Sequence, residues 1–542
     1  MKHKKSENTA SITKPANGNT TTLPSSPENP SKHEHKEIHD KIENTVNNNY
    51  ITIFKWIVFF FFLYALPLIL ADVLYKDDIR RVMYGDPSTW YRDGRPLMAY
   101  ILTAFSFGTP LVDTSPLPLL AGILILSFSM ALFYKKYLHN YDNLSAVLCL
   151  LMLIISPFFL ENLSFKFESL GMCITLALII ILFSLPDHIS KPECFLLSGI
   201  TSICISCIYQ ATMGAFFSFL FFTAFIELKE TTKDSTLKQY LEKAFYKTAG
   251  FCLGTLFYMG RIAPYFVAKD GYQAEHSQII PFTAEGLIKF YKNLKGFLDY
   301  LQLMYFPDSK AFITYLSGAV IITAIIATVF YIKDILAVRQ DKTKYSKACF
   351  VLIAPFLIIC FAFLPMCILT NPNYMPRAFL SFNIFLLFIG FLLITLSKKR
   401  RLILLIFIPV YFFSYSFSYA YANLLKSQAD FEDHVAQSIV YDLNKINGID
   451  SSYRFFVEGK RIVAKDVSLA TKRYSIFSLM IPNNLRKDYV FTGHLLSRYS
   501  TYRITTDNLK KYNPENYKTI THNSLYRIMQ NKKNIVIEFI YK

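Results

Sequence analysis

Long apolar stretches separated by short polar loops form the main pattern of this sequence. They recur from about residue 53 to residue 424, and each is about 16 to 23 residues long. A helix of about 20 apolar residues is long enough to cross the hydrocarbon core of a bilayer. The pattern therefore predicts eleven membrane-spanning helices, at about 53–74, 116–134, 143–160, 169–186, 194–208, 211–228, 244–266, 311–332, 348–370, 377–396 and 402–424.

Polar segments flank and interrupt this set of helices. Residues 1–49 are rich in Ser, Thr, Asn, Pro and Lys, so we expect a disordered tail. Residues 50–424 form the membrane-spanning domain, which contains two long loops at 75–115 and 267–310. Residues 425–542 predict a small α+β domain, because RFFVEG, RIVAKD and NIVIEFIY resemble strands in their pattern of apolar and polar residues.

The distribution of Lys and Arg predicts the orientation of the chain. These residues are concentrated in four loops between apolar stretches, at 135–142, 229–243, 333–347 and 397–401. Because cytoplasmic loops carry an excess of basic residues, we expect a cytoplasmic N-terminus. With an odd number of spans, the C-terminal domain and the two long loops then lie on the extracytoplasmic side. In the second of these loops, residues 283–305 predict an amphipathic helix that lies on the membrane.

Composition agrees with a membrane protein. Hydrophobic residues make up 53% of the 542 residues and charged residues only 18%, and the mean hydropathy is positive at +0.29. These values exclude a water-soluble enzyme, a disordered scaffold and a disulfide-rich secreted protein. The net charge of +18 lies in short loops between apolar stretches. We therefore expect no binding of nucleic acid, which needs a basic surface long enough to follow the phosphate backbone.

The loop 75–115 departs from this distribution of charge. Its start, LYKDDIRRVMYGDPSTWYRDGRP, combines many basic and acidic residues on the side where basic residues are usually scarce. Charged groups at a membrane face are unfavourable unless they are paired or functional. The loop is therefore either a solvated segment held by salt bridges or part of a reaction site.

Two adjacent carboxylates in this loop are the candidates for catalysis. Asp77 and Asp78 follow the first apolar stretch closely. A carboxylate can act as a general base on a hydroxyl group, which typically contributes about 10²–10⁴-fold to the rate. Adjacent residues on a helix or strand cannot face the same way. We therefore expect one of the two to point into the site and the other to orient it or pair with a neighbouring arginine.

The same loop has the residues needed to bind a phosphorylated sugar. Arginines hold phosphate in a bidentate manner and balance its charge, and the candidates are Arg80, Arg81 and Arg95. Trp90 can stack on the apolar face of a sugar ring, although an interfacial tryptophan can equally anchor the loop at the headgroup level. Asp93 is a further candidate for contact with the substrate.

Three charged residues outside this loop are also expected at the outer face. Glu161 and Glu168 lie close to the membrane edge in SPFFLENLSFKFESLGM, where they either cap helices or face the substrate. Arg377 begins a predicted span, so its long side chain either reaches lipid headgroups or contacts the substrate.

The arrangement of these motifs resembles a known family. DDIRRVMYG, the W and DGRPL that follow it, LVDTSPLPLL and ENLSFKFESLGM occur in order between about residues 70 and 180. Shorter similarities occur at IYQA (208–211) and NPNYMPRAFL (371–380). Together they resemble the bacterial serotype-converting O-antigen glucosyltransferases of the type II family, which are membrane glycosyltransferases of the GT-C fold. Residues 425–542 show no such resemblance.

The resemblance implies a function and a location. It implies a GT-C-like catalytic domain that transfers glucose from undecaprenyl-phosphate glucose to a sugar of the lipopolysaccharide O-antigen. The reaction would take place on the periplasmic face of the bacterial inner membrane, and separate proteins would make and flip the donor. In this class the first outer loop usually carries a catalytic acidic residue, a position that Asp77 and Asp78 occupy here.

Other functions remain open at this stage. An O-antigen polymerase would share the location and the phosphate-binding arginines, and a lipid-linked sugar flippase or a transporter would also span the membrane many times. A flippase needs polar groups along its spans, whereas charged residues are nearly absent from mid-span here. The hypothesis includes no soluble cofactor, and a divalent metal beside the paired aspartates is left open.

Overall fold

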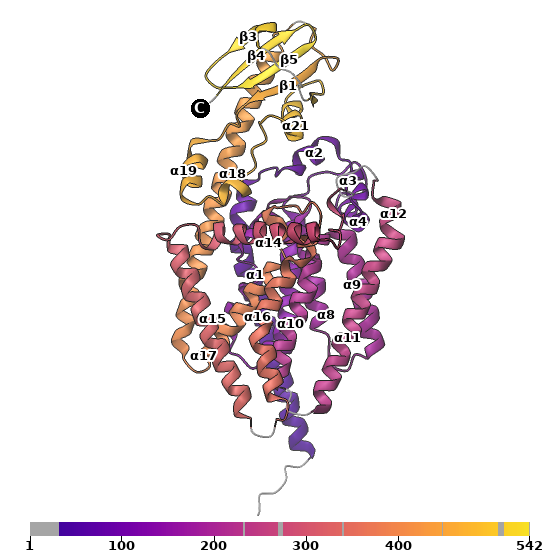
Figure 1. Ribbon diagram of the computed structural model, residues 1–542, viewed down its shortest axis with the longest axis vertical. Helices are drawn as coiled ribbons and strands as arrows, with labels where there is room; N and C mark the ends of the chain where they lie inside the picture. The colour runs from indigo at the N-terminus through magenta and orange to yellow at the C-terminus, as the bar shows by residue number, and fades with distance from the viewer. Residues whose placement is uncertain are drawn as a thin grey trace, which may run out of the picture. The chain divides into compact units, whose positions relative to one another are not determined.

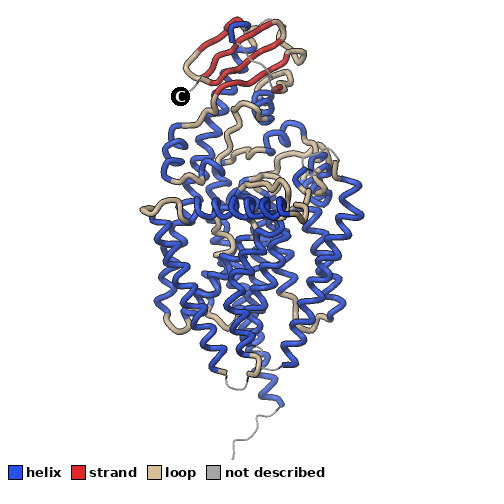
Figure 2. Tube along the Cα trace, viewed as in Figure 1, coloured by secondary structure: helices blue, strands red, loops and turns tan. Residues whose placement is uncertain are grey.

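The computed structural model describes residues 32–230, 234–268, 275–338, 341–446, 448–507 and 514–540. Residues 48–542 form one compact unit and residues 1–47 another, and the description below concerns the first of these. This unit is mainly helical, and its strands are gathered in the C-terminal domain (Figure 2).

Long apolar helices form a bundle in the first part of the chain (Figure 1). Rings from several of these helices pack in the core, with Phe216 stacked on Phe251 and Phe225 stacked on Tyr331. The principal helices are α1 (Lys32–Ala71), α5 (Leu117–Phe133), α8 (Ser169–Phe183), α9 (Lys191–Ile208), α10 (Met213–Glu230), α11 (Asp234–Phe257), α15 (Phe312–Ala337), α16 (Lys344–Cys367), α17 (Phe382–Ser397) and α18 (Phe407–Leu443).

The predicted count of eleven membrane-spanning helices is not confirmed. In the described part of the chain, seven helices are long and apolar enough to cross a membrane, judged by length and composition. The helices α8 and α17 are apolar but have only 15 and 16 residues, which corresponds to about 22–24 Å against a hydrocarbon core of about 30 Å. The seven are Asn49–Ala71, Leu117–Leu138, Lys191–Ile208, Gln210–Leu228, Phe312–Ala337, Lys344–Cys367 and Arg401–Leu443.

The predicted span 143–160 is not one continuous helix. It consists of α6 (Asn143–Leu151) and the start of α7 (Pro157–Ser164), which are separated by a non-helical segment. Pro157 disfavours the helical conformation of the residue before it, and Ser156 is extended accordingly. The interruption gives α7 its own start, and every residue of this short helix is buried.

The helices α9 and α11 approach each other closely along small residues. Gly250 and Gly254, four residues apart in α11, face Phe195 and Gly199 of α9. A Cβ atom added at Gly254 would lie 2.3 Å from the carbonyl oxygen of Gly199, and one at Gly250 would lie 2.1 Å from that of Phe195. Small residues at this spacing are typical of tightly packed helices in membranes.

The C-terminal domain combines one sheet with the end of α18. Val435, Ile439 and Leu443 of α18 pack against the buried side chains of the sheet. The strand order is β2-β1-β5-β4-β3, with β1 parallel to β2 and β5, and with β4 antiparallel to β3 and β5. The strands are β1 (Arg454–Gly459), β2 (Thr506–Asp507), β3 (Lys518–His522), β4 (Tyr526–Asn531) and β5 (Asn534–Phe539), and the helices are α19 (Lys465–Arg473), α20 (Phe477–Met480) and α21 (Val490–Arg498).

One of the three predicted strand segments is wrong. RFFVEG and NIVIEF form β1 and β5, but RIVAKD is an irregular segment followed by the start of α19. Its backbone is bound by the amide of Gln428 in α18, which donates to the carbonyl of Ile462 (3.2 Å) and accepts from the N–H of Ala464 (2.9 Å). These hydrogen bonds replace those of a sheet partner.

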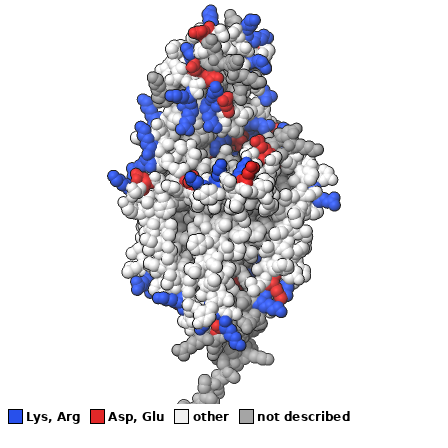
Figure 3. Space-filling view, in the orientation of Figure 1, with Lys and Arg blue, Asp and Glu red and all other residues white. Residues whose placement is uncertain are grey.

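The elements of the loop 75–115, which is the first outer loop of the predicted topology, lie at the same end of the bundle as the C-terminal domain (Figure 1). The loop contains three helices, α2 (Asp77–Tyr84), α3 (Ser88–Arg92) and α4 (Pro96–Phe105), and α14 (Ala284–Tyr305) runs across the bundle helices near them. On the face shown in Figure 3, charged side chains gather above and below a band that is almost free of them. This distribution suits a membrane that surrounds the middle of the bundle.

We expect Gly254→Ala to destabilise the bundle, because the new methyl group would meet the backbone of α9. Overpacking of this kind typically costs about 1–3 kcal/mol. The melting temperature of the purified protein in detergent should fall. Gly318→Ala in α15 is the matched control, because a Cβ there has no neighbour within 4 Å and alanine favours a helix by about 0.5–1 kcal/mol. Equal melting temperatures for the Gly254 variant and the wild type would contradict the close contact.

Candidate functional site

The short helix α2 positions the two adjacent aspartates. It begins directly after Lys76 and ends at Gly85, whose left-handed conformation terminates the helix. Asp77 and Asp78 occupy its first turn, where the helix dipole favours negative charge. The two side chains face different environments, as expected of adjacent positions on a helix.

Asp78 is fully buried and binds backbone. Its Oδ2 accepts hydrogen bonds from the N–H groups of Lys166 (2.9 Å) and Tyr75 (3.2 Å). Its Oδ1 lies 3.7 Å from Nη1 of Arg81. Asp78 therefore connects the start of α2 to the turn that precedes α8, and no part of its side chain is open to solvent.

Asp77 is the more accessible of the two. Its side chain is 38% exposed, and its carboxylate lies 3.8 Å from the guanidinium of Arg377. Arg377 comes from a single helical turn at 376–379. At 3.8 Å the two groups form an ion pair rather than a close hydrogen bond, so both can exchange this contact for another.

Glu161 organises a second set of contacts. This buried carboxylate of α7 accepts hydrogen bonds from Nζ of Lys76 (2.6 Å) and the hydroxyl of Tyr75 (2.8 Å) at one oxygen. The other oxygen accepts from the backbone N–H of Arg377 at 2.6 Å. Glu161 thus holds the residues before α2 and the turn that carries Arg377 in one place.

Glu168 binds the other side of the first loop. It accepts hydrogen bonds from Nη2 of Arg81 (2.6 Å) and from the indole N–H of Trp90 (2.7 Å). The guanidinium of Arg81 also lies over the ring of Trp90, 4.2 Å from its centroid. Trp90 is completely buried, so its ring anchors the loop in the protein interior.

The two buried carboxyl groups Asp78 and Glu168 have different acidities. Burial raises the pKa of Asp78 to about 7, and the nearby Arg81 only partly offsets this effect. Burial also acts on Glu168, but the charges of Arg81, Arg95 and Arg377 outweigh it and lower the pKa to about 2. Glu168 is therefore a permanent anion, whereas Asp78 is partly protonated near neutral pH.

Arg95 is linked to Arg377 through Tyr209, whose hydroxyl donates to the carbonyl of Arg377 (3.1 Å). The Nε of Arg95 donates to the side chain of Gln210 (3.0 Å), and its guanidinium lies over the ring of Tyr209, 5.3 Å from its centroid. The amide of Gln210 also contacts the carbonyl of Asp93 and the hydroxyl of Tyr258. These contacts place the loop beside the turn between α9 and α10.

Arg80 and Asp93 are the remaining candidates of this loop. Arg80 is half-exposed and lies 3.8 Å from the exposed Asp86. The side chain of Asp93 is half-buried, and burial raises its pKa. Among the residues that the structure describes, no group of three His, Cys, Asp or Glu side chains is arranged to hold a metal ion.

Several residues of the site had not been singled out from the sequence. They are Tyr75, Lys76, Lys166 and the pair Tyr209–Gln210, which contributes to the environment of Arg95. Lys166 in addition forms salt bridges with Asp72 and Asp113. A signal was present for Lys76, which adjoins Asp77 in the sequence, and for Lys166, which lies between Glu161 and Glu168.

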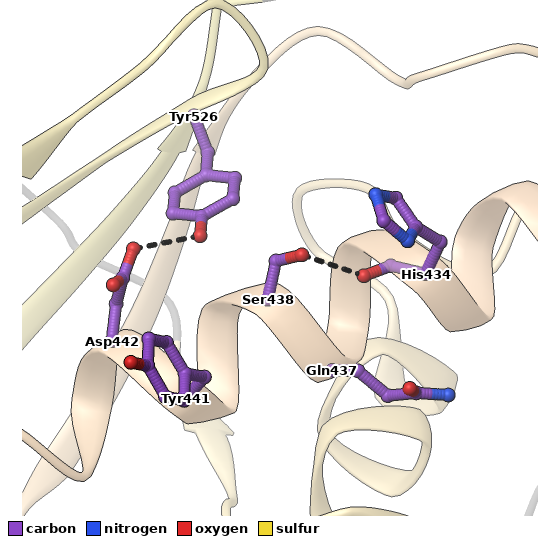
Figure 4. Close-up of a pocket in the computed structure, with 6 residues that line it drawn as sticks. All are labelled: His434, Gln437, Ser438, Tyr441, Asp442 and Tyr526. Atoms are coloured by element: carbon purple, nitrogen blue, oxygen red, sulfur yellow. Dashed lines mark hydrogen bonds between the residues drawn. The ribbon is translucent and has the colours of Figure 1, made fainter.

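A different hollow of the surface lies on the C-terminal domain (Figure 4). This open depression of about 390 Å³ is lined by His434, Gln437, Ser438, Tyr441, Asp442 and Tyr526. The hydroxyl of Tyr526 donates to Asp442 (2.8 Å), and that of Ser438 donates to the carbonyl of His434 (2.9 Å). None of the carboxylates and arginines described above lines it, so we treat it as separate from the candidate site.

Comparison with known proteins identifies a relative of this chain. The chain is 27% identical over 489 residues to a protein of Salmonella phage P22, described as an uncharacterized 55.3 kDa protein in the gtrB 5' region. The alignment covers 88% of this chain and 96% of the phage protein. No solved structure matches the chain.

A family match covers the part of the chain that holds the site. The family described as glucosyl transferase GtrII matches residues 66–394, a range that includes the first outer loop, Glu161, Glu168 and Arg377. Because this match extends over more than half of the chain, the protein belongs to the glucosyl transferase GtrII family.

Proposed function

We propose that this protein transfers glucose from undecaprenyl-phosphate glucose to a sugar of the lipopolysaccharide O-antigen, on the periplasmic face of the bacterial inner membrane. The family match supports a glucosyltransferase. The observation that carries the proposal is the position of a half-exposed aspartate beside a loosely paired arginine at one end of an apolar helix bundle. A lipid-linked donor would present its phosphate and sugar at this level of the membrane.

The donor phosphate would bind to the arginines that retain free donor groups. Among the described residues, the guanidinium of Arg377 forms an ion pair with Asp77 at 3.8 Å and lies above the ring of Phe165. Arg95 uses Nε for Gln210, which leaves its two terminal nitrogens for an anion. Two planar guanidinium groups suit the bidentate recognition of a phosphate better than lysines would.

Arg81 would contribute through its charge and not through contact with the donor. It is 7% exposed and already paired with Glu168, and its Nε and Nη1 have no hydrogen-bond partner among the described residues. Its charge adds to the positive potential at the site without contact with solvent. Arg80 is half-exposed and paired with Asp86, so we assign it no contact with the donor.

The reaction would be a single inverting displacement with Asp77 as the base. The acceptor hydroxyl oxygen forms a bond with the anomeric carbon of glucose while the bond between this carbon and the phosphate oxygen breaks. The hydroxyl proton passes to the carboxylate of Asp77, and the lipid phosphate leaves with the bonding electrons. Because Asp77 is partly exposed, it can release the proton to water afterwards.

Other residues would hold this arrangement in place. Asp78 fixes the start of α2 through two backbone hydrogen bonds, so we assign it a positioning role. Glu161 holds Arg377, and Glu168 holds Arg81 and Trp90. The hypothesis includes no cofactor. An O-antigen polymerase or a lipid-linked sugar flippase is the alternative, and either would bind a polyprenyl phosphate without transferring a single glucose.

Glucose transfer by the purified protein tests both the function and the base. Wild-type protein in liposomes should transfer labelled glucose from undecaprenyl-phosphate glucose to O-antigen polysaccharide. Asp77→Asn should lower turnover by about 10²–10⁴-fold, because it removes the base and keeps the size of the side chain. Asp78→Asn should reduce turnover less, because an amide oxygen can still accept the two backbone hydrogen bonds. Full activity of Asp77→Asn would refute the assignment, and chain elongation by the wild type would favour a polymerase.

A conservative substitution tests the role of Arg377. If its guanidinium holds the donor phosphate, Arg377→Lys should lose nearly as much activity as Arg377→Ala, because lysine lacks the bidentate fork. Loss of one such contact should raise the apparent donor KM about tenfold or more, or lower turnover if the contact strengthens in the transition state. Arg92→Lys, at an exposed arginine of the same loop, is the matched control. An Arg377→Lys variant with wild-type kinetics would show that Arg377 only balances Asp77.

The buried carboxyl group of Asp78 predicts a dependence of stability on pH. Its pKa is about 7 in the folded protein and near 3.9 in an unfolded chain. A raised pKa stabilises the folded state below pH ~4, and this stabilisation is lost as the pH rises towards ~7. Asp78→Asn removes the titration, so its melting temperature relative to the wild type should rise between pH 4 and 7. A difference that stays constant over this range would show that Asp78 is ionised throughout.

A further inference from the structure

Four ring side chains form a continuous row between the first outer loop and the C-terminal domain. Tyr84, in the last turn of α2, contacts His494 of α21 with ring centroids 5.9 Å apart. His494 contacts Phe491 at 6.0 Å, and Phe491 contacts Tyr489 at 5.1 Å. We refer to Tyr84, Tyr489, Phe491 and His494 as the ring row.

An arginine lies at each end of the ring row. The guanidinium of Arg503 is 5.7 Å from the centroid of the Tyr84 ring, and that of Arg486 is 3.8 Å from the centroid of the Tyr489 ring. Both arginines are exposed, and Tyr84 is 38% exposed. The other three rings are half-buried. Neighbouring rings in the row are inclined to one another by 58–75°. The row is therefore a partly exposed apolar surface of ring edges and faces with cationic ends.

The ring row shares α2 with the proposed base, because Asp77 lies in the first turn of this eight-residue helix and Tyr84 in its last turn. Burial lowers the pKa of His494, the charges of Arg80 and Arg503 lower it further, and the charge of Asp77 opposes them. Burial raises the pKa of Tyr489, and the charges of Asp77 and Arg377 act on it as well. The same carboxylate thus acts on two members of the row, one on each side of Phe491.

We propose that the ring row binds the polysaccharide acceptor and presents one of its hydroxyl groups to Asp77. This inference rests on the proposed function. Rings offer an apolar surface to the C–H face of a pyranose, and such burial contributes without fixing a particular sugar. The terminal arginines donate hydrogen bonds to hydroxyl or carboxylate groups of the glycan at both ends of the row.

Position distinguishes the ring row from the depression in Figure 4. That depression also combines an exposed tyrosine, Tyr441, with polar groups. It is formed by α18 and β4, whereas the ring row includes α2, the helix that carries Asp77. An acceptor in the depression would lack this link to the reacting group, so Tyr441 serves as the control for an exposed tyrosine of the same domain.

Binding and transfer are measured separately to test the inference. The probe is O-polysaccharide released by mild acid from lipopolysaccharide, titrated against the full-length protein in detergent without donor. Tyr489→Ala and His494→Ala should each weaken binding about tenfold or more, as expected of central aromatic contacts. Both should raise the acceptor KM by a similar factor and leave the donor KM unchanged. Tyr489→Phe should retain binding because it keeps the ring, and Tyr441→Ala should bind like the wild type.

The outcomes separate this inference from the proposed function. If the wild type transfers glucose and both alanine variants bind the acceptor as well as the wild type does, the proposed role of the ring row is refuted and the proposed function stands. Wild-type binding that depends on the ring row, without any glucose transfer, supports the row and overturns the chemistry. Absence of both binding and transfer in the wild type overturns both. Loss of binding in Tyr441→Ala alone moves the acceptor to the depression and refutes the inference.

Discussion

The pairing of buried charges at one end of an apolar bundle is the constraint on which the site depends. Glu161 and Glu168 are almost completely buried, and a carboxylate in such a place is stable only with cationic or N–H partners. Lys76 and Arg81 supply these charges, and both belong to the first outer loop. The loop therefore folds onto the bundle instead of extending into solvent.

The need to pair these buried charges determines both the position of the first outer loop and the surroundings of Asp77 and Arg377. Removal of one partner of a buried ion pair typically costs about 3–5 kcal/mol, because the other charge remains without compensation. Each glutamate also holds a second group, the backbone of Arg377 for Glu161 and the indole of Trp90 for Glu168. The ion pairs thus set where Arg377 and Asp77 meet, although neither pair includes Asp77.

Much of this architecture could be predicted from the sequence, but the pairing of side chains could not. Apolar length located most of the helices, and the concentration of both basic and acidic residues drew attention to the loop 75–115. The count of eleven spans was not confirmed. The helices α8 and α17 are shorter than a bilayer, Pro157 interrupts another span, and α11, which covers much of the predicted span 244–266, is not among the seven candidates. Both glutamates were identified near the membrane edge, yet their partners in the loop 75–115 lie 78 to 87 positions away in the chain, and no local pattern encodes such contacts.

The helix α18 has a consequence for how this protein can diversify. It continues without a break from the bundle to the core of the C-terminal domain, so the two ends turn together. One residue inserted in its middle would rotate the domain by about 100° and lift it by about 1.5 Å, which would separate α21 from α2. If relatives exchanged this domain, the length of α18 would therefore have to stay the same, so that the domain keeps its rotation about the helix axis. Substitutions on the surface of the domain outside the ring row leave this orientation unchanged, whereas changes in the length of α18 alter it.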